Sequence, residues 1–416
     1  MTVRSGAIRH FAKIKNGSTP ASGEPSFWDG DIAWATPDDL GRLDGKFISK
    51  TKRNITPLAV AENNLNVVPP GTVLLSTRAP IGHMAINTSP MAFNQGCRAL
   101  IPQPETHGPF LFYLLESRIP ELNASANGTT FVELSRDDLA CVRISLPSLD
   151  TQKRIAAFLD EKTKRIDALI ANKRALLERL TEKRHAIITH AVTKGLSPAV
   201  PMMNSGIDWL GEIPAHWKVK RLKYLTRAPL KYGANASAEW NEPDWPRFIR
   251  ITDVDQSGNL RPDTFRSLPP EVAEPYLLAE GDILLARSGA TVGKSFIYRK
   301  DWGAACFAGY LILARIGRHH SADFIYQYLN SDAFWSWAGA SLIQSTIQNI
   351  SAERYANLWV PCPPLSEQIA IADAVSLLRS QIADRERKVE QSLNMLNEYR
   401  SSLVTAAVTG QLEGLR

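Results

Sequence analysis

Apolar residues recur every seven positions in a long segment near the end of the chain, at Val375, Ile382, Val389, Leu396 and Leu403. Heptad spacing of this kind forms the seam of a coiled-coil helix. Pro363 stands just before the segment and Gly410 near its end, at places typical of a helix start and stop. The pattern therefore predicts one long helix within 363–412.

An earlier segment repeats the pattern in the same phase. Its seam positions are Leu159, Ile166, Leu180 and Ile187, with Lys173 as the one polar member of the series. We predict a second long helix over 148–195. A single such helix would suggest a dimeric coiled coil. Two helices of equal length and phase in one chain favour an antiparallel pair, because each helix can cover the seam of the other.

The helices belong to a duplication that covers the whole chain. LPSLDTQKRIAAFLD, from Leu146, aligns without a gap with CPPLSEQIAIADAV, from Cys362, and Gln152 falls on Gln368. Upstream, VVPPGTVLLSTRAPIGHMAI resembles LLAEGDILLARSGATVGKSFIY, an alignment that places Arg78 on Arg287. Both stretches have the pattern of a strand, a turn and a second strand, and a helical period follows.

These patterns predict an α+β fold with a pseudo-twofold internal repeat, in which two mixed α/β domains are joined by two long antiparallel coiled-coil helices. The expected boundaries are 1–147 for the first domain, 148–195 for the first helix, 196–217 for a linker rich in Pro, Gly and Ser, 218–362 for the second domain and 363–412 for the second helix. Each domain has the usual size of an independent folding unit.

Composition narrows the location and class of the protein. The chain has 416 residues and a formal net charge of +6. It contains no apolar run long enough for a membrane helix, and its four cysteines show no CxxC pairing, so a reducing cytoplasm is the expected location. The first long helix has an excess of Lys and Arg, which we interpret first as a solvated basic face.

The sequence displays no recognisable catalytic or ligand-binding motif. The stretch from Ser288 to Ser295 resembles a phosphate-binding P-loop. However, it has no glycine separated by four residues from its Gly-Lys pair, and no helical pattern follows, so a hairpin turn is expected there. His185 and His190 are five residues apart and do not share a helix face, which makes a poor metal pair. We predict no catalytic residue and no metal site.

Longer motifs in a fixed order carry a family resemblance. They are GSTPASGEPSFWDGDIAWATPDDL, LLSTRAPIG, FNQG, the connector DWLGEIPAHWKVKRLKYL, PCPPLSEQIAIA and the closing AVTGQLEG. With the twofold repeat, the chain closely resembles the DNA-specificity (S) subunit of type I restriction-modification enzymes over essentially its whole length. The second domain departs from the opening motif, having WPRFIRITDVD where the first has DIAWATPDDL.

The resemblance implies a non-catalytic DNA-recognition subunit. Each domain would be a target recognition domain for one half of an asymmetric, bipartite double-stranded DNA target, and the helices would set the spacing and dock partners. The implied partners are two modification subunits, which are adenine methyltransferases, and restriction/translocase subunits. S-adenosylmethionine, ATP and Mg²⁺ are implied for those partners, and no cofactor is expected in this chain.

Analogy and turn position suggest which residues contact DNA, since base recognition needs paired donors and acceptors and phosphate binding needs hydroxyls and amides. In the first domain the candidates are Thr36, Asp38, Arg78, Asn94, Gln95, Thr129 and Thr130. In the second domain they are Arg250, Arg287, Ser288, Lys294, Tyr310, Gln344, Ser345 and Gln348. The alternative for each is a polar residue that stabilises a turn.

Two other classes of protein remain open at this point. A fused, catalytically active restriction nuclease or methylase would need catalytic motifs that the sequence does not display. A coiled-coil scaffold that binds only proteins would not need two domains of this size with polar hairpin loops. Both features favour a recognition subunit.

Overall fold

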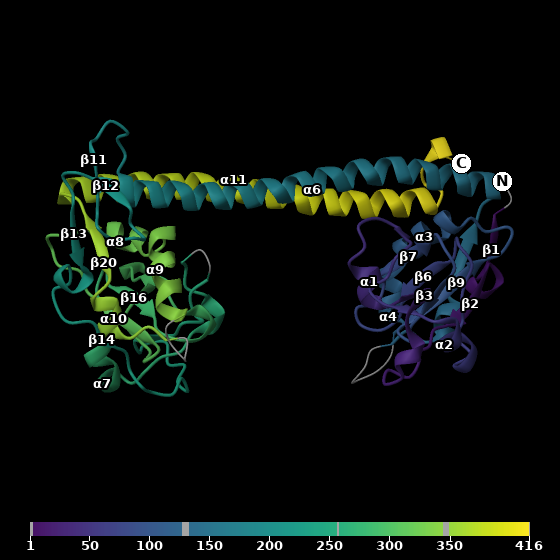
Figure 1. Cartoon of the computed structure of the whole chain (residues 1–416), viewed down its shortest axis with the longest axis horizontal. Helices are drawn as coiled ribbons and strands as arrows, with labels where there is room; N and C mark the ends of the chain where they lie inside the picture. Colours follow the sequence, from purple (N-terminus) through teal and green to yellow (C-terminus); the bar gives the residue numbers. More distant parts are fainter. Residues whose placement is uncertain (1–2, 127–132, 256–257, 344–348, 416) are drawn as a thin grey trace. The chain divides into compact units, whose positions relative to one another are not determined.

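The computed structural model describes residues 3–126, 133–255, 258–343 and 349–415 (Figure 1). The chain divides into two compact units: unit 1 is 1–173 with 390–416, and unit 2 is 174–389. Each unit contains one α/β domain and parts of the long helices α6 (Leu149–Lys194) and α11 (Leu365–Val408). The predicted α+β fold with two mixed domains and two long helices is confirmed.

Local sequence explains where the long helices begin and end. In α6, the hydroxyl of Ser148 accepts a hydrogen bond from the backbone N–H of Thr151 at 3.3 Å, which satisfies one free donor of the first turn. At the other ends, Gly195 and Gly410 have φ angles of 81° and 72°. This left-handed conformation favours glycine and closes a helix C-terminus.

Within each unit the two helices run antiparallel. In unit 1 the start of α6 and the end of α11 share one buried cluster, which contains Leu159 and Ala407. In unit 2 the end of α6 and the start of α11 do the same, through Ala191 and Val375. An ion pair in each unit also joins the helices, Arg400 with Asp167 at 2.8 Å in unit 1 and Arg184 with Glu386 at 3.3 Å in unit 2.

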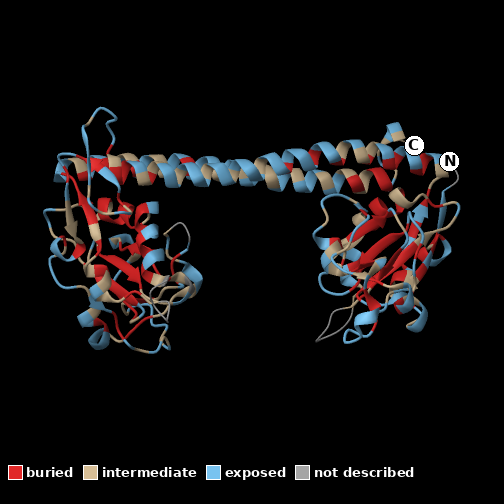
Figure 2. Ribbon diagram, viewed as in Figure 1, coloured by how far each residue is buried: buried red, intermediate tan, exposed pale blue. Residues whose placement is uncertain are grey.

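The heptad positions chosen from the sequence lie on the less exposed side of both helices. Leu159, Ile166, Val375 and Ile382 are buried, and Leu180, Ile187, Val389, Leu396 and Leu403 are half-buried. Figure 2 shows that buried residues gather on the strands of the domains and toward the ends of the long helices. The middle stretches of the helices are mostly half-buried or exposed.

Unit 1 has a mixed sheet in the order β2-β9-β6-β7-β4, a smaller sheet β5-β3-β8 and a pair β1-β10. Its strands are β1 (Arg4–Ala7), β2 (Ala12–Asn16), β3 (Trp28–Ala35), β4 (Phe47–Ile48), β5 (Asn54–Ile55), β6 (Val73–Ser76), β7 (Met84–Asn87), β8 (Met91–Phe93), β9 (Cys97–Pro102) and β10 (Arg143–Leu146). Its shorter helices are α1 (Pro37–Gly41), α2 (Pro57–Glu62), α3 (Gly108–Ser117), α4 (Ile119–Ala124) and α5 (Arg136–Cys141), with 3-10 turns η1 (Ile8–His10), η2 (Pro25–Phe27) and η8 (Glu413–Leu415).

Unit 2 has a sheet in the order β14-β19-β16-β17 and the pairs β15-β18, β13-β20 and β11-β12. Its strands are β11 (Met202–Asn204), β12 (Glu212–Pro214), β13 (Lys218–Arg221), β14 (Lys231–Tyr232), β15 (Arg247–Ile249), β16 (Ile283–Ala286), β17 (Ser295–Ile297), β18 (Ala305–Phe307), β19 (Leu311–Ala314) and β20 (Trp359–Cys362). Its shorter helices are α7 (Pro270–Ala273), α8 (Ala322–Tyr328), α9 (Asp332–Ile343) and α10 (Ala352–Ala356), with 3-10 turns η3 (Leu222–Tyr224), η4 (Pro262–Thr264), η5 (Glu274–Tyr276), η6 (Gly289–Thr291) and η7 (Lys300–Trp302).

A buried glutamine fixes each long helix to its domain in the same way. The side-chain oxygen of Gln152 accepts a hydrogen bond from the backbone N–H of His107 at 2.8 Å, and its amide donates to the carbonyl oxygen of Pro147. In unit 2 the oxygen of Gln368 accepts from the N–H of Ser321 at 2.8 Å, and its amide donates to the carbonyl oxygen of Pro363. The duplication therefore extends to individual hydrogen bonds.

Candidate nucleic-acid interface

Three loops meet at the ends of strands β3, β6 and β8 in unit 1. The backbone N–H of Asn94 donates to the carbonyl oxygen of Ala35 at 2.9 Å, and the N–H of Thr77 donates to that of Gly96 at 2.8 Å. The N–H of Leu134 in turn donates to the carbonyl oxygen of Thr77 at 2.8 Å. These bonds hold the loops after all three strands, together with the segment at 133–134, in one patch.

Unit 2 repeats this framework with other residues. The N–H of Ala308 donates to the carbonyl oxygen of Ile249 at 3.0 Å, and the N–H of Arg287 donates to that of Tyr310 at 3.0 Å. The N–H of Ile350 then donates to the carbonyl oxygen of Arg287 at 2.8 Å. The two patches therefore share one backbone arrangement.

These bonds correct the sequence alignment of Arg78 with Arg287. Thr77, not Arg78, occupies the place of Arg287, because both donate to the turn that follows β8 or β18. Arg78 instead matches Ser288, since each forms an isolated antiparallel β-bridge, Arg78 with Glu133 and Ser288 with Asn349. Identity of the two arginines is a misleading guide, because backbone pairing determines which residues are equivalent. The turn from β16 to β17 in unit 2 is also longer than the turn from β6 to β7 in unit 1.

Thr36 follows β3 and caps the N-terminus of α1, and Asp38 lies in the first turn of that helix. The hydroxyl of Thr36 accepts a hydrogen bond from the N–H of Asp39, and the Asp39 carboxylate accepts from the N–H of Thr36 at 2.9 Å. Asp38 is exposed and pairs with Arg42 at 2.9 Å. The sequence T-x-x-D is a capping signal, so the part played by Asp39 could have been predicted.

Arg250 holds the matching place in unit 2. Its backbone N–H donates to the carboxylate of Asp253 at 2.8 Å, the same bond that Thr36 makes to Asp39. Its guanidinium also binds this buried carboxylate through two hydrogen bonds, at 3.0 and 2.8 Å. Arg250 therefore stabilises the loop, and its guanidinium is mainly occupied by hydrogen bonds within the domain.

Arg78 belongs to a small charged cluster that the sequence analysis missed. Glu133 accepts hydrogen bonds from Arg78 and from Arg98, each at 3.0 Å. Arg98 is buried in strand β9 and also donates to the carbonyl oxygen of Gln95 at 2.9 Å. An arginine inside the apolar run CRALIP was the available signal, because a buried charge needs a partner.

Asn94 and Gln95 form the turn after β8. The side-chain oxygen of Asn94 accepts from the N–H of Gly96 at 2.9 Å, which shapes the turn. Gln95 is exposed, and the hydroxyl of Thr19 donates to its side-chain oxygen. The amide group of Gln95 stands at the surface of the patch and can both donate and accept hydrogen bonds.

In unit 2 the candidates gather around the end of β16. The guanidinium of Arg287 lies over the ring of Tyr232, 4.8 Å from its centroid, and Tyr310 is 67% exposed. Ser288 is half-buried and Lys294 is exposed in the hairpin turn between β16 and β17. That turn confirms the expected hairpin in the stretch resembling a P-loop. Tyr232, 55 positions before Arg287 in the chain, was not predicted.

The remaining candidates, Thr129, Thr130, Gln344, Ser345 and Gln348, lie outside the described residues. Their neighbours in the chain, Glu133 and Asn349, pair with Arg78 and Ser288 at the edge of the two patches.

Two cysteines, Cys97 in β9 and Cys306 in β18, are fully buried. Burial raises the pKa of Cys97 to about 12 and that of Cys306 to about 12. Both thiols are protonated at neutral pH, and a thiol without its thiolate form is a poor nucleophile. Among the residues that the structure describes, no group of three His, Cys, Asp or Glu side chains could hold a metal ion.

Comparison with known families identifies the family to which this chain belongs. A family model described as "Type I restriction modification DNA specificity domain" matches residues 3–179 and 214–395. The chain belongs to this family. The two matches cover the two domains and most of the long helices, so the family's specificity domain occurs twice, as the internal repeat predicts.

Curated relatives of this specificity subunit extend over most of its length. The specificity subunit of type I restriction enzyme MjaIX from Methanocaldococcus jannaschii is 27% identical over 97% of this chain and 92% of its own length. The EcoDI specificity subunit from Escherichia coli is 23% identical over 73% of this chain and 70% of its own length.

Solved structures share the fold at lower identity. One, from work on complex assembly and conformational transition of the type I R-M system, has a TM-score of 0.77 and 18% identity and covers 99% of this chain and 98% of its own. The crystal structure of the HsdS subunit from Thermoanaerobacter tengcongensis has a TM-score of 0.53 and 16% identity, with 99% and 97% covered.

As a type I specificity subunit, the chain acts in DNA sequence recognition. The paired loop patches at the ends of β3, β6 and β8 and of β15, β16 and β18 are the candidate contact surfaces. In the described parts of the specificity subunit, no helix is long and apolar enough to cross a membrane.

Proposed function

We propose that each unit recognises one half of a bipartite double-stranded DNA target through its loop patch. The observation that carries the proposal is a shared backbone framework with different side chains. Thr36, Thr77 and Gly96 in unit 1 correspond to Arg250, Arg287 and Tyr310 in unit 2. Base recognition depends on the donors and acceptors offered to the groove, so the two half-sites differ in sequence and the target is asymmetric.

The chemistry of each patch suits this task. Unit 1 offers the exposed amide of Gln95 and the half-exposed guanidinium of Arg78, and amides and guanidinium groups form paired hydrogen bonds with adenine and guanine edges. Unit 2 offers Arg287, Lys294 and the exposed ring of Tyr310. Lys294 is suited to a phosphate and Arg287 to a base edge.

The long helices supply the second half of the proposed function, docking of modification and restriction subunits. Met395 and Tyr399 are 69% and 59% exposed, four residues apart on one face of α11. Exposed apolar side chains grouped on one helix face are typical of a protein interface. Leu169 on α6 is a further exposed apolar residue, at 50%.

Catalysis in this account belongs to the partners. The names of the relatives, which are type I restriction enzyme specificity subunits, support a role in specificity. Methyltransferase and translocase subunits would carry out the reactions, and this chain would direct them. S-adenosylmethionine, ATP and Mg²⁺ would be bound by those partners. The location proposed for the assembled enzyme is the cytoplasm, where it meets DNA.

Selection from random DNA tests the proposal. The chain is mixed with its modification subunit, and duplexes retained from a random library are sequenced. We expect two conserved blocks of unlike sequence, separated by a spacer of fixed length and free composition. One block only, or two identical inverted blocks, would contradict the assignment of a separate half-site to each unit.

A further inference from the structure

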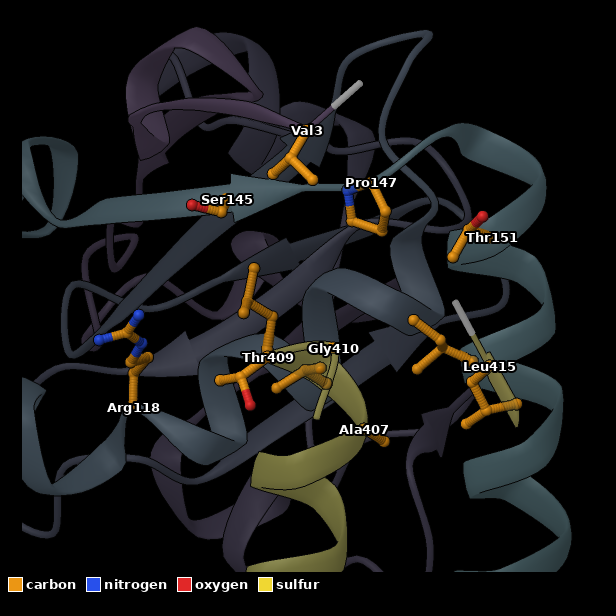
Figure 3. Close-up of a pocket in the computed structure, with 12 residues that line it drawn as sticks. Val3, Arg118, Ser145, Pro147, Thr151, Ala407, Thr409, Gly410 and Leu415 are labelled. Atoms are coloured by element: carbon orange, nitrogen blue, oxygen red, sulfur yellow. The ribbon is translucent and has the colours of Figure 1, made fainter. Parts of the chain in front are cut away.

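Two cavities of unit 1 differ in chemistry. The one drawn in Figure 3 has a volume of about 370 Å³ and is lined mainly by apolar side chains, among them Val3 and Ala407. The other, of about 410 Å³, lies along the edge strand β2 and has a mainly polar lining without a carboxylate among its described residues. The cations in this lining are Arg9, Lys13, Lys15 and Arg136. A cavity of this composition suits an anionic ligand.

Three of these cations form a row that begins in η1 and continues along β2. Ile14 is buried, so the alternation of the strand places Lys13 and Lys15 together on the outer face. Arg9 lies in η1, just before the strand, and its guanidinium donates to Cys141 Sγ at 3.5 Å, at the end of α5. We call Arg9, Lys13 and Lys15 the basic edge of unit 1.

The basic edge adjoins the loop patch of unit 1. β2 is antiparallel to β9 and β9 is antiparallel to β6, so β2 and β6 end on the same side of the sheet. Just after β2, the N–H of Ser18 donates to the carbonyl oxygen of Phe93 at 3.0 Å. The hydroxyl of Thr19 donates to the side chain of Gln95, in the turn after β8. DNA bound at the patch can therefore extend along the basic edge.

Unit 2 has a lysine at the place of Lys15, as strand pairing shows. Lys15 faces a residue of β9 that in turn faces β6, and Lys231 faces a residue of β19 that in turn faces β16. The two series are Lys15, Ala99 and Leu74 in unit 1 and Lys231, Leu313 and Leu284 in unit 2. The last residue of each series stands three positions after the glycine at 71 or 281, so the two lysines are equivalent.

The other two cations match by their distance from a shared backbone bond. The carbonyl oxygen of Phe11 accepts a hydrogen bond from the N–H of Gln103 at 2.9 Å. In unit 2 the carbonyl oxygen of Leu225 accepts one from the N–H of Gly317 at 2.8 Å. Each unit has one cation two residues before this acceptor and another two residues after it. The matched pairs are Arg9 with Lys223 and Lys13 with Arg227.

The three cations of the basic edge of unit 2, Lys223, Arg227 and Lys231, are exposed. Lys223 donates to the side-chain oxygen of Asn357 at 3.0 Å, just after α10, as Arg9 donates to the end of α5. Lys231 donates to the carbonyl oxygen of Pro275 at 2.7 Å. Because an ammonium group has three donors, both lysines can also bind an anion.

The basic edge keeps its charge between the units, whereas the loop patches change. In the patches Thr77 corresponds to Arg287, but each position of the basic edge is cationic in both units. Arg136, at the start of α5, is not repeated, since Ala352 begins the matching helix. Two half-sites of unlike sequence have the phosphate backbone in common, and phosphate contacts carry no sequence information. The retained cations therefore suit the backbone.

We propose that the basic edge of each unit binds the phosphate backbone of the DNA beside the half-site of that unit. The inference rests on the proposed recognition of one half-site by each unit, and it adds a contact that does not depend on sequence. A cation that neutralises a phosphate releases condensed counterions, so the contact strengthens binding most at low salt. The backbone contact also holds the duplex in register while the loop patch contacts the bases.

The test measures the affinity of the full chain, in complex with its modification subunit, for duplex DNA over a series of salt concentrations. The double variant Lys13→Gln/Lys15→Gln should reduce the slope of log Kd against log salt by about 2, since each lost phosphate contact removes about 1. Affinity should fall equally for the selected target and for a duplex of unrelated sequence. Lys13→Arg/Lys15→Arg should keep the wild-type slope, because the charges are retained.

Lys164→Gln/Lys388→Gln is the matched control, because it removes the same charge from exposed positions on α6 and α11. It should keep the wild-type slope. An unchanged slope in Lys13→Gln/Lys15→Gln would overturn the proposal and leave these lysines the role of discouraging edge-to-edge pairing. An equal reduction in the control would also overturn it, since total charge would then explain the effect.

Failure of the proposed function would give a different result. Selection from random DNA would then lack two unlike blocks, whereas the salt slope on a duplex of unrelated sequence would still report on the basic edge. In unit 2, Arg227→Gln/Lys231→Gln should lower the slope as the unit 1 variant does and keep the sequence preference at both half-sites. A changed preference at one half-site would contradict the assignment to phosphates.

Discussion

Thr77 and Arg287 occupy the same place in the two recognition domains: the backbone N–H of each donates to the turn after β8 or β18, and the carbonyl oxygen of each accepts from the segment that leads to the last strand. A buried threonine in unit 1 thus corresponds in unit 2 to a guanidinium stacked over Tyr232. The scaffold is retained, and the chemical group that it presents has changed.

Arg287→Ala is expected to weaken recognition of one half-site only. Loss of a paired hydrogen bond to a base edge costs about 1–3 kcal/mol of discrimination. The measurement is binding to duplexes in which each half of the selected target is varied separately, with Arg318→Ala at an exposed position as the control. Uniform loss of affinity for all sequences would assign Arg287 to a phosphate, and no loss would remove it from the interface.

Glu133→Ala is expected to destabilise unit 1 by about 1–3 kcal/mol, because it leaves the buried guanidinium of Arg98 without its carboxylate. Asp38→Ala is the control, since its pair with Arg42 is mostly exposed and such pairs contribute about 0–1 kcal/mol. Chemical denaturation of the two variants measures the difference. Equal stability would mean that the Glu133 cluster is solvated in solution.

Gln368→Leu is expected to loosen the junction of α11 with unit 2. The change leaves the half-buried N–H of Ser321 and the buried carbonyl oxygen of Pro363 without their glutamine partner, at a cost of about 1–3 kcal/mol. Gln381→Leu, at an exposed position on the same helix, is the control. Hydrogen exchange should show faster opening at the start of α8 in Gln368→Leu alone, and unchanged exchange there would contradict this role.

Neighbouring positions on α11 should separate folding from docking. Leu396→Glu places a charge at a half-buried seam position and should lower the melting temperature and abolish partner binding together. Met395→Glu changes a side chain that is 69% exposed and should weaken binding of the modification subunit while the melting temperature stays constant. If both variants melt alike, the seam has been misplaced.

The stability of unit 2 should fall on acidification. Burial, followed by the charges of Lys220 and His319, lowers the pKa of His320 below its ordinary value. The unfolded chain therefore binds a proton more readily than the folded chain. This contribution to stability is complete above the unfolded pKa of about 6.5 and is lost progressively as pH falls below that value toward the lower pKa of the folded state. His320→Asn should reduce the loss of melting temperature between about pH 7.5 and about pH 5.5. The exposed His190→Asn should not, and equal slopes would refute the assignment.

The architecture was predictable because it is repeated and periodic. Heptad spacing from Val375 to Leu403 and its copy from Leu159 to Ile187 indicate long helices, since only such elements keep a seven-residue register over many turns. Glycines at 71 and 281, each before an apolar strand, mark the common strand-turn-strand unit. These signals come from residues close together along the chain, so a single sequence is enough to reveal them.

The detailed sites were less predictable because they are formed by contacts between distant segments. The position of the Arg78 side chain depends on its hydrogen bond to Glu133, and that of Arg287 depends on its contact with the ring of Tyr232. Neither partner is identified by spacing along the chain. The correspondence of Thr77 with Arg287 depends on backbone pairing across a turn of unequal length, for which residue identity is a poor guide.

The most direct test of the account is long-read mapping of adenine methylation in cells that express the modification gene with and without this chain. We expect one split, asymmetric methylated motif that appears only when the chain is present. Absence of any such motif, with an active modification subunit expressed, would contradict the assignment of sequence recognition to this chain.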